Sequence, residues 1–213
     1  MIWAARTYAV GAAMALLALR LDLRRSVSTS HDALQDAECA CSDAPPFLRD
    51  DVTRADVPRD FSGLTLTLRR GTCAAAAIAA RRLGGLGQRD AMAPLLMALR
   101  HRSCRVRVAS ADALANFADT GVVTGLTAAL SDRDRRVRGD AAWSLAKVGD
   151  ARAVSALIQV ARDSSSQVRQ AAVSALGAIG DPRAARVVTA ALRDPDKHVR
   201  QAAAEALGKL RTR

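Results

Sequence analysis

The sequence is poor in several residue types that specialised sites need. Only 3% of its 213 residues are aromatic, histidine occurs three times, and glutamate occurs only at Glu38 and Glu205. A di-iron or similar metal centre needs several histidine and carboxylate ligands that converge on one point, and this supply is too small. The shortage of aromatic residues argues against a β fold and against a cleft in which a nucleobase stacks. We therefore predict no catalytic residues, no cofactor and no metal, in a protein that is not an enzyme.

Acidic residues are scarce in the C-terminal two-thirds of the chain. Residues 72–213 carry 23 basic and 12 acidic side chains, which accounts for the whole net charge of +11, whereas residues 1–71 are balanced. A basic region suits an acidic partner, such as an acidic protein, a nucleic acid or an anionic lipid. A solvated surface rich in arginine is the alternative explanation, so the charge alone does not name a partner.

A period of 31 residues runs through this basic region. Leucine recurs at this step, and so does a valine followed by arginine. The recurring positions are Leu83, Leu114, Leu145, Leu176 and Leu207, together with Val106–Arg107, Val137–Arg138, Val168–Arg169 and Val199–Arg200. A fixed period of this length indicates stacked supersecondary units, not a closed globule.

Residues 132–162 show what one unit contains. Asp132 is a candidate N-cap of a first helix, which runs to about Val148 and ends at Gly149. Asp150 then caps a second helix, and the break of two residues between them makes an antiparallel hairpin. Equivalent aspartates recur at the same period, Asp163 and Asp194 for the first helix, Asp119 and Asp181 for the second. Because one hairpin cannot bury its apolar face alone, we predict an all-α superhelix of about four and a half stacked hairpins.

Cysteine is too sparse for a disulfide framework. Cys39 and Cys41 form a pair with no second pair or histidine at metal-ligand spacing. Cys73 and Cys104 are one period apart, which should separate them by about 8–10 Å, one helix-packing distance. Their Cα atoms would then exceed the limit of about 7 Å for a disulfide, so we predict that both are reduced and buried.

The part of the chain before the repeats falls into two segments. Residues 1–25 contain an apolar run over residues 2–19 that only Arg6 interrupts, a marginal length for a membrane span. We predict a helix that tethers the protein to a membrane; a signal peptide, or a soluble helix of a cytoplasmic protein, are the alternatives. Residues 26–71 are acidic and punctuated by proline, so we predict a linker, with a short strand over residues 63–68.

Residues 168–184 carry a very regular copy of the repeat. Their sequence, VRQAAVSALGAIGDPRA, follows the pattern VRxAAxxxLGxIGDxRA. This pattern resembles the short HEAT-like repeat first associated with phycobilisome lyases, and the resemblance covers residues 72–213. It implies an α/α superhelix that usually serves as a protein-interaction scaffold. Phycobilin lyase subunits and deoxyhypusine hydroxylases share the repeat, and a related solenoid group includes DNA glycosylases, so the resemblance identifies the fold and not the activity.

The residues of this chain do not carry the activities of those relatives. The hydroxylases bind two irons through His-Glu dipeptides, whereas none of His31, His101 and His198 is followed by glutamate. No motif indicates a tetrapyrrole pocket. We therefore predict a monomeric, non-catalytic scaffold that binds another protein, an acidic one. An electrostatic nucleic-acid binder and a subunit of a lyase or oxidoreductase are the alternatives.

Two sets of residues are candidates for specific roles. Arginines of the valine–arginine pairs lie within reach of helix-cap aspartates, so we predict a ladder of ion pairs that sets the register of the stack. Its members are Arg107, Arg138, Arg169, Arg200, Asp119, Asp150 and Asp181. The candidates for partner contact are Trp143, Arg100, Arg162, Arg193 and Arg186. An exposed tryptophan is a typical binding hot spot, and the alternative is that its ring folds over a neighbouring repeat.

Overall fold

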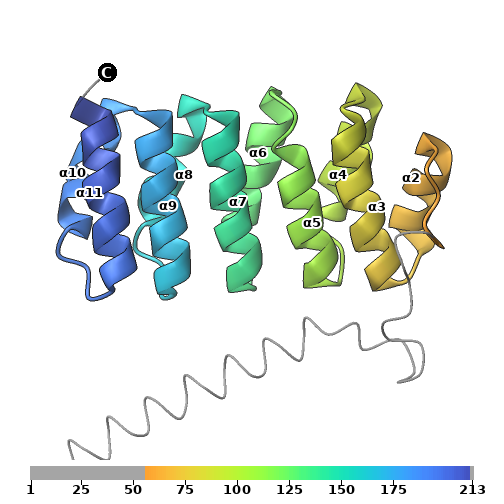
Figure 1. The fold of residues 1–213 in the computed structure, drawn as a ribbon, viewed down its shortest axis with the longest axis horizontal. Coiled ribbons are helices and arrows are strands. Elements are labelled where there is room, and N and C mark those ends of the chain that lie inside the picture. Colours follow the sequence, from red (N-terminus) through yellow and green to blue (C-terminus); the bar gives the residue numbers. More distant parts are fainter. Residues whose placement is uncertain (1–55, 212–213) are drawn as a thin grey trace, which may run out of the picture. The chain divides into compact units, whose positions relative to one another are not determined.

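The computed structural model describes residues 56–211, which belong to one compact unit. In this part of the chain the regular elements are all helices (Figure 1). The α-helices are α2 (Phe61–Arg70), α3 (Cys73–Leu86), α4 (Met92–Ala98), α5 (Cys104–Leu114), α6 (Thr120–Ala129), α7 (Arg135–Val148), α8 (Val154–Val160), α9 (Ser166–Ile179), α10 (Ala185–Ala191) and α11 (Lys197–Arg211). Short 3-10 helices, η3 (Arg89–Ala91), η4 (Ala151–Ala153) and η5 (Pro182–Ala184), precede α4, α8 and α10. The prediction of an all-α fold is confirmed.

The helices form antiparallel pairs that stack side by side. The first helices of the pairs, α3, α5, α7, α9 and α11, form one layer, which we call the A layer (Figure 1). The second helices, α4, α6, α8 and α10, form the B layer behind it. Each B helix also packs against the A helix that follows it. Four hairpins and a final single helix make the predicted superhelix of four and a half units.

The residues that keep the period form the core between the layers. Leu83, Leu114, Leu145 and Leu176 have no exposed surface, and the four periodic valines are equally buried. Burial of one such side chain stabilises the fold by about 1.5–3 kcal/mol. Alanines occupy about half of the remaining buried positions, which lets neighbouring A helices approach closely. The 31-residue period is therefore the spacing of the core.

Helix ends follow the predicted signals except at the N-termini of α7 and α9, where the N-caps are Asp134 and Ser165 in place of Asp132 and Asp163. Gly149 ends α7 with φ of 72°, a left-handed conformation that glycine adopts without strain. Asp119 and Asp150 accept the capping hydrogen bonds of α6 and η4, as predicted. The prediction that Asp132 caps α7 is wrong, because the N-cap is Asp134. Asp132 instead accepts a hydrogen bond from the backbone N–H of Asp134 and holds the turn before the helix.

The repeat domain extends upstream of the predicted boundary. Residues 63–68 belong to α2 and not to a strand, so that prediction is wrong. The alternation of threonine and leucine also places Leu64 and Leu68 one helical turn apart, and both are buried where α2 packs against α3. Asp60 caps α2, with 2.8 Å from its Oδ2 to the backbone nitrogen of Gly63. The linker prediction is therefore wrong for the residues of α2.

The predictions for the N-terminal segments concern residues outside the described range. These are the tether over residues 2–19, the remainder of the segment 1–25, and residues 26–55 of the linker. Within residues 56–211, no helix combines the length and apolar character needed to cross a membrane.

The two repeat-region cysteines differ in state. Cys73 is buried with a free thiol, as predicted. Cys104 is also buried, but it is disulfide-bonded. The two are thus not bonded to each other, as their spacing predicts, whereas the prediction that Cys104 is reduced is wrong.

Candidate functional site

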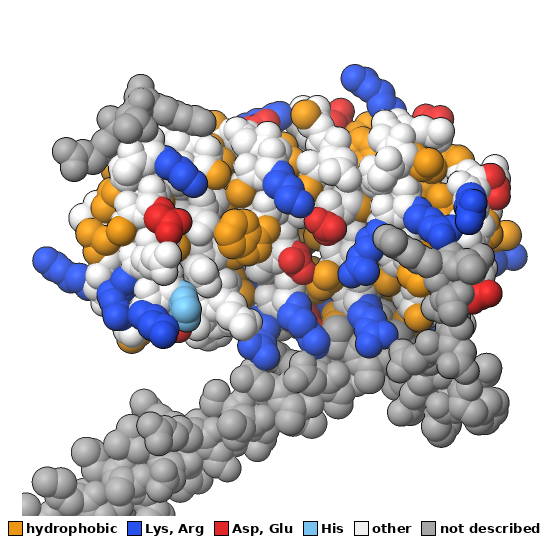
Figure 2. All heavy atoms as spheres, viewed as in Figure 1, with side chains coloured by type: hydrophobic (Ala, Val, Ile, Leu, Met, Phe, Trp, Pro, Cys, Tyr) orange, Lys and Arg blue, Asp and Glu red, His pale blue; other side chains and the backbone are white. Residues whose placement is uncertain are grey.

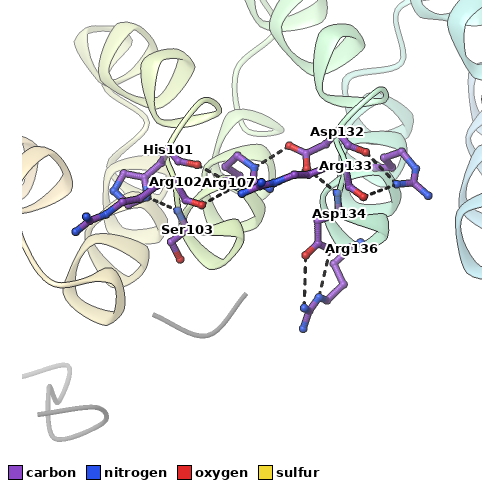
Figure 3. A network of polar contacts seen from close by, with 9 residues as sticks. His101, Arg102, Ser103, Arg107, Asp132, Arg133, Asp134 and Arg136 are labelled. Carbon is purple, nitrogen blue, oxygen red and sulfur yellow. Dashed lines mark hydrogen bonds and ion pairs between the residues drawn. The ribbon is translucent and has the colours of Figure 1, made fainter. Parts of the chain in front are cut away.

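Arginines of the A layer form ion pairs from one hairpin to the next. Arg107 donates from Nε and Nη2 to the two carboxylate oxygens of Asp132, at 2.7 and 2.8 Å. Its Nη1 also donates to the backbone carbonyls of His101 and Arg102 (Figure 3). The same arrangement recurs at Arg138–Asp163 and Arg169–Asp194. We call these three pairs the arginine ladder.

The ladder differs in its acidic members from the predicted set. Its aspartates lie 25 residues after each arginine, in the turn that leads into the next A helix, and they are not Asp119, Asp150 and Asp181. Arg200 donates to the carbonyls of Asp194 and Pro195 but pairs with no carboxylate among residues 56–211. In the pair nearest the C-terminus, hydrogen bonds from Arg169 lower the pKa of Asp194 below its ordinary value.

The predicted ladder aspartates Asp150 and Asp181 have a different role. Each caps a 3-10 helix and pairs with the arginine two residues later, Arg152 or Arg183. Those arginines continue to the preceding hairpin, where Arg152 donates to Oγ1 of Thr120 at 3.0 Å and Arg183 to a backbone carbonyl. The stack is therefore linked a second time, at the turns inside the hairpins. The period of the aspartates could have shown both rows, but it does not show which arginine reaches which carboxylate.

The ion pair between Asp150 and Arg152 predicts how the carboxyl group of Asp150 titrates. Hydrogen bonds from the side chain and backbone of Arg152 lower the pKa of Asp150 from 3.8 to about 2. A carboxyl group whose pKa is depressed on folding stabilises the fold above its unfolded pKa, near 4, and this contribution is lost as the pH falls through 2. We expect the carboxyl carbon of Asp150 to titrate near pH 2 by NMR, and to titrate closer to 3.8 in Arg152→Ala. An unchanged midpoint in that variant would contradict the assigned cause.

Three of the predicted contact residues line one edge of the array. Arg100, Arg162 and Arg193 each follow a B helix, in the turn to the next A helix, and all three are exposed. None of their side chains forms an ion pair or hydrogen bond within residues 56–211. Ser131 interrupts the row between the first two. We call these three arginines the basic edge.

A groove between α4 and α6 adjoins the basic edge. Its volume is about 630 Å³, and its lining is mainly apolar, with Leu96, Met97 and Gly125 among the lining residues. The side chain of Met97 is 72% exposed, and Arg100 and Asp132 also line the groove. Gly125 lets Leu96 pack closely against α6 beside the groove, because a Cβ there would lie 2.4 Å from Leu96 Cδ2. Met97 was not predicted as a contact residue. A signal was present, because the positions one, two and three periods later hold the small or polar residues Ala128, Gln159 and Ala190.

The other two predicted contact residues lie elsewhere. Arg186 is exposed on α10, away from the turn that carries Arg193. Trp143 is on α7 in the A layer and is 47% exposed, so its ring is not buried by a neighbouring repeat. The predicted contact set is therefore spread over both layers and does not form one site.

The described residues show no group suited to hold a metal. No three histidine, cysteine or acidic side chains of residues 56–211 come together in a way that could bind an ion.

Solved structures of similar fold include complexes with other polypeptides. A chain of the complex of CpcE and CpcF of phycocyanin lyase from Nostoc sp. PCC7120 is 26% identical, with a TM-score of 0.62 over 80% of this chain and 70% of that chain. A designed armadillo repeat protein in complex with the peptide (KR)4 is 18% identical, with a TM-score of 0.58 over 84% of this chain and 92% of its own. An engineered protein is 21% identical, with a TM-score of 0.55 over 87% and 91%. The last two likenesses show the fold alone.

No match is found among curated proteins. The family model of HEAT repeats matches three overlapping stretches, residues 62–146, 92–164 and 154–213. Together they span well over half of the chain, and they begin in α2, which agrees with the inclusion of that helix in the stack. The predicted resemblance is confirmed, and the chain belongs to the HEAT repeat family.

Proposed function

We propose that this repeat array is a monomeric, non-catalytic scaffold that binds another protein. The observation that carries the proposal is the α4–α6 groove, where an exposed methionine and an arginine stand at an apolar depression. Apolar pockets with a few polar groups at the rim are typical binding sites. The unbranched thioether of Met97 adapts its shape to an incoming side chain.

The groove and the basic edge together favour an acidic partner. An apolar side chain of the partner would fill the groove beside Met97, and a carboxylate would pair with Arg100 at its end. Arg162 and Arg193 extend the positive charge along the same edge at about 10 Å per repeat, the usual distance between packed helices. A partner with carboxylates at intervals along an extended or helical segment would therefore engage several repeats. The three arginines of the ladder are unavailable for this, since their guanidinium groups are paired with aspartates.

The similar structures support a role in binding polypeptides. One of them is a complex between two protein chains, and another is a repeat protein bound to a peptide. A rigid stack presents side chains at fixed intervals, which limits the entropy lost on binding.

A site-specific crosslink tests this proposal. A photoreactive amino acid in place of Met97, in the full chain in its native cell, should give one discrete crosslinked protein. Arg100→Glu should reduce that product at least fivefold, because it replaces the attraction of a carboxylate by repulsion, while the melting temperature stays within about 2 °C.

The matched control places the same photoreactive residue at Gln159. This residue lies on α8, two periods after Met97, and is exposed in the same way. It does not line the groove. Equal products from both positions, or crosslinks to nucleic acid in place of protein, would overturn the proposal. Binding to random duplex DNA that weakens steeply with salt would support the nucleic-acid alternative instead.

A further inference from the structure

The A layer carries an exposed tryptophan beside a carboxylate. Asp140, Trp143 and Lys147 are three and four residues apart on α7, so their side chains lie in a row on one face of the helix. Figure 2 shows the side of the molecule that the A layer faces, with hydrophobic side chains over α7 in its middle and acidic side chains next to them. This face is separate from the α4–α6 groove, because its residues belong to the other layer.

The carboxylate of Asp140 has no partner among the residues that the structure describes. Arg136, one turn before Asp140 on the same face of α7, pairs with Asp134. Lys147, two turns after Asp140, pairs with Asp112 of α5, with 3.2 Å between Nζ and Oδ1. Asp140 forms no hydrogen bond or ion pair within residues 56–211, although its side chain is half-buried. Burial raises the pKa of Asp140, and so does the charge of Asp112, while Arg81 and Lys147 oppose this rise. The existing cations therefore do not compensate the buried negative charge.

We propose that this face of α7 binds an arginine side chain presented by a partner protein, with the guanidinium stacked on Trp143 and hydrogen-bonded to Asp140. A guanidinium is planar, so it can lie on an indole ring and still donate two parallel hydrogen bonds to a carboxylate. The molecule already uses this carboxylate geometry in the arginine ladder, where Arg107 and Asp132 pair at 2.7 and 2.8 Å.

Other occupants fit the face less well. An anion would be repelled by the two carboxylates of Asp112 and Asp140. A purely apolar partner would bury Asp140 further without supplying a counter-charge, which costs free energy. Lysine supplies the charge but is a compact ammonium that lacks the planar fork. An arginine both covers the indole and neutralises the carboxylate.

The net charge of the protein makes the test selective. A cationic peptide should be repelled by a chain of net charge +11, so any saturable binding identifies a local acidic site. The two tryptophans are Trp3 and Trp143, and Trp3→Phe leaves Trp143 as the single indole reporter. The probe is a short acetylated Gly-Arg-Gly peptide amide added to the full-length Trp3→Phe chain, with the indole N–H signal followed by NMR.

We expect a saturable shift of the indole signal. Asp140→Asn should weaken binding at least fivefold, whereas Asp90→Asn, at an exposed position in η3, should leave it unchanged. Peptides with lysine or with uncharged citrulline in place of arginine should bind at least threefold and tenfold more weakly, respectively. No shift up to about 10 mM peptide, a limit near the weakest specific affinities, would overturn the inference. So would an equal affinity of Asp140→Asn or of the citrulline peptide.

This inference and the proposed function fail independently. Arg100→Glu lies in the other layer and should not change the arginine-peptide affinity at Trp143. A chain that binds the arginine peptide but gives no crosslink at Met97 would retain this site and lose the groove as a docking surface.

Discussion

Replacing Arg107 by alanine should lower the free energy of unfolding by about 3–5 kcal/mol, the usual effect of removing one member of a buried ion pair. Arg107 is 5% exposed, and its removal leaves the carboxylate of Asp132 without its bidentate donor. The carbonyls of His101 and Arg102 lose a donor as well. The loss is a large fraction of the 5–15 kcal/mol that stabilises a typical domain. Urea denaturation followed by circular dichroism measures it.

The chain supplies a matched control for this experiment. Arg200 occupies the equivalent position on α11, makes the two carbonyl hydrogen bonds and is exposed, but no carboxylate of the described part of the chain pairs with it. Arg200→Ala should therefore cost less than about 1 kcal/mol, the net value of ordinary hydrogen bonds. Equal losses in the two variants would show that the pairing with Asp132 contributes nothing. Because repeat arrays can unfold in parts, the comparison also needs coincident transitions by two probes.

The 31-residue period predicted the fold because the same positions are buried in every repeat. Leu114 and Leu145 lie in equivalent environments, so one repeat explains the others. The period also predicted the glycine that ends α7 and the aspartates that cap the second helices. It failed at α2, where the sequence of the helix does not contain the repeat, and where the Thr-Leu alternation satisfies both strand and helix spacing.

The candidate surface was less predictable than the fold. Alignment of the repeats on the 31-residue period identified Arg100 and Trp143 as candidates for partner contact, and both are exposed. The groove could not be predicted, because it depends on how far α4 and α6 stand apart, and the same column holds different residues in other repeats. The pairing of Arg107 with Asp132 was missed for a related reason: it joins α5 to the turn before α7, and the relative positions of these two segments follow only from the stacking of hairpins.

Gly84→Ala should destabilise the protein by about 1–2 kcal/mol, although alanine is the better helix former. Gly84 lies in α3 where this helix crosses α5, and a Cβ there would lie 2.6 Å from Ala113 Cβ and 2.7 Å from its Cα. The obstacle is backbone, so the two helices must separate, and forced overpacking of this kind costs about 1–3 kcal/mol. The gain in helix propensity, about 1 kcal/mol, offsets only part of that cost.

The adjacent residue of the same helix gives the control. A Cβ at Gly85 would meet nothing within 4 Å, so Gly85→Ala should stabilise the protein by up to about 1 kcal/mol through helix propensity alone. The two variants differ by one position and should move the melting temperature in opposite directions in a thermal scan. Gly177→Ala, three periods after Gly84, should destabilise the protein as Gly84→Ala does, because a Cβ there would lie 2.6 Å from Ala206 Cα. Stabilisation in all three variants would mean that neighbouring A helices separate easily, and that close packing at Gly84 and Gly177 does not set the spacing of the array.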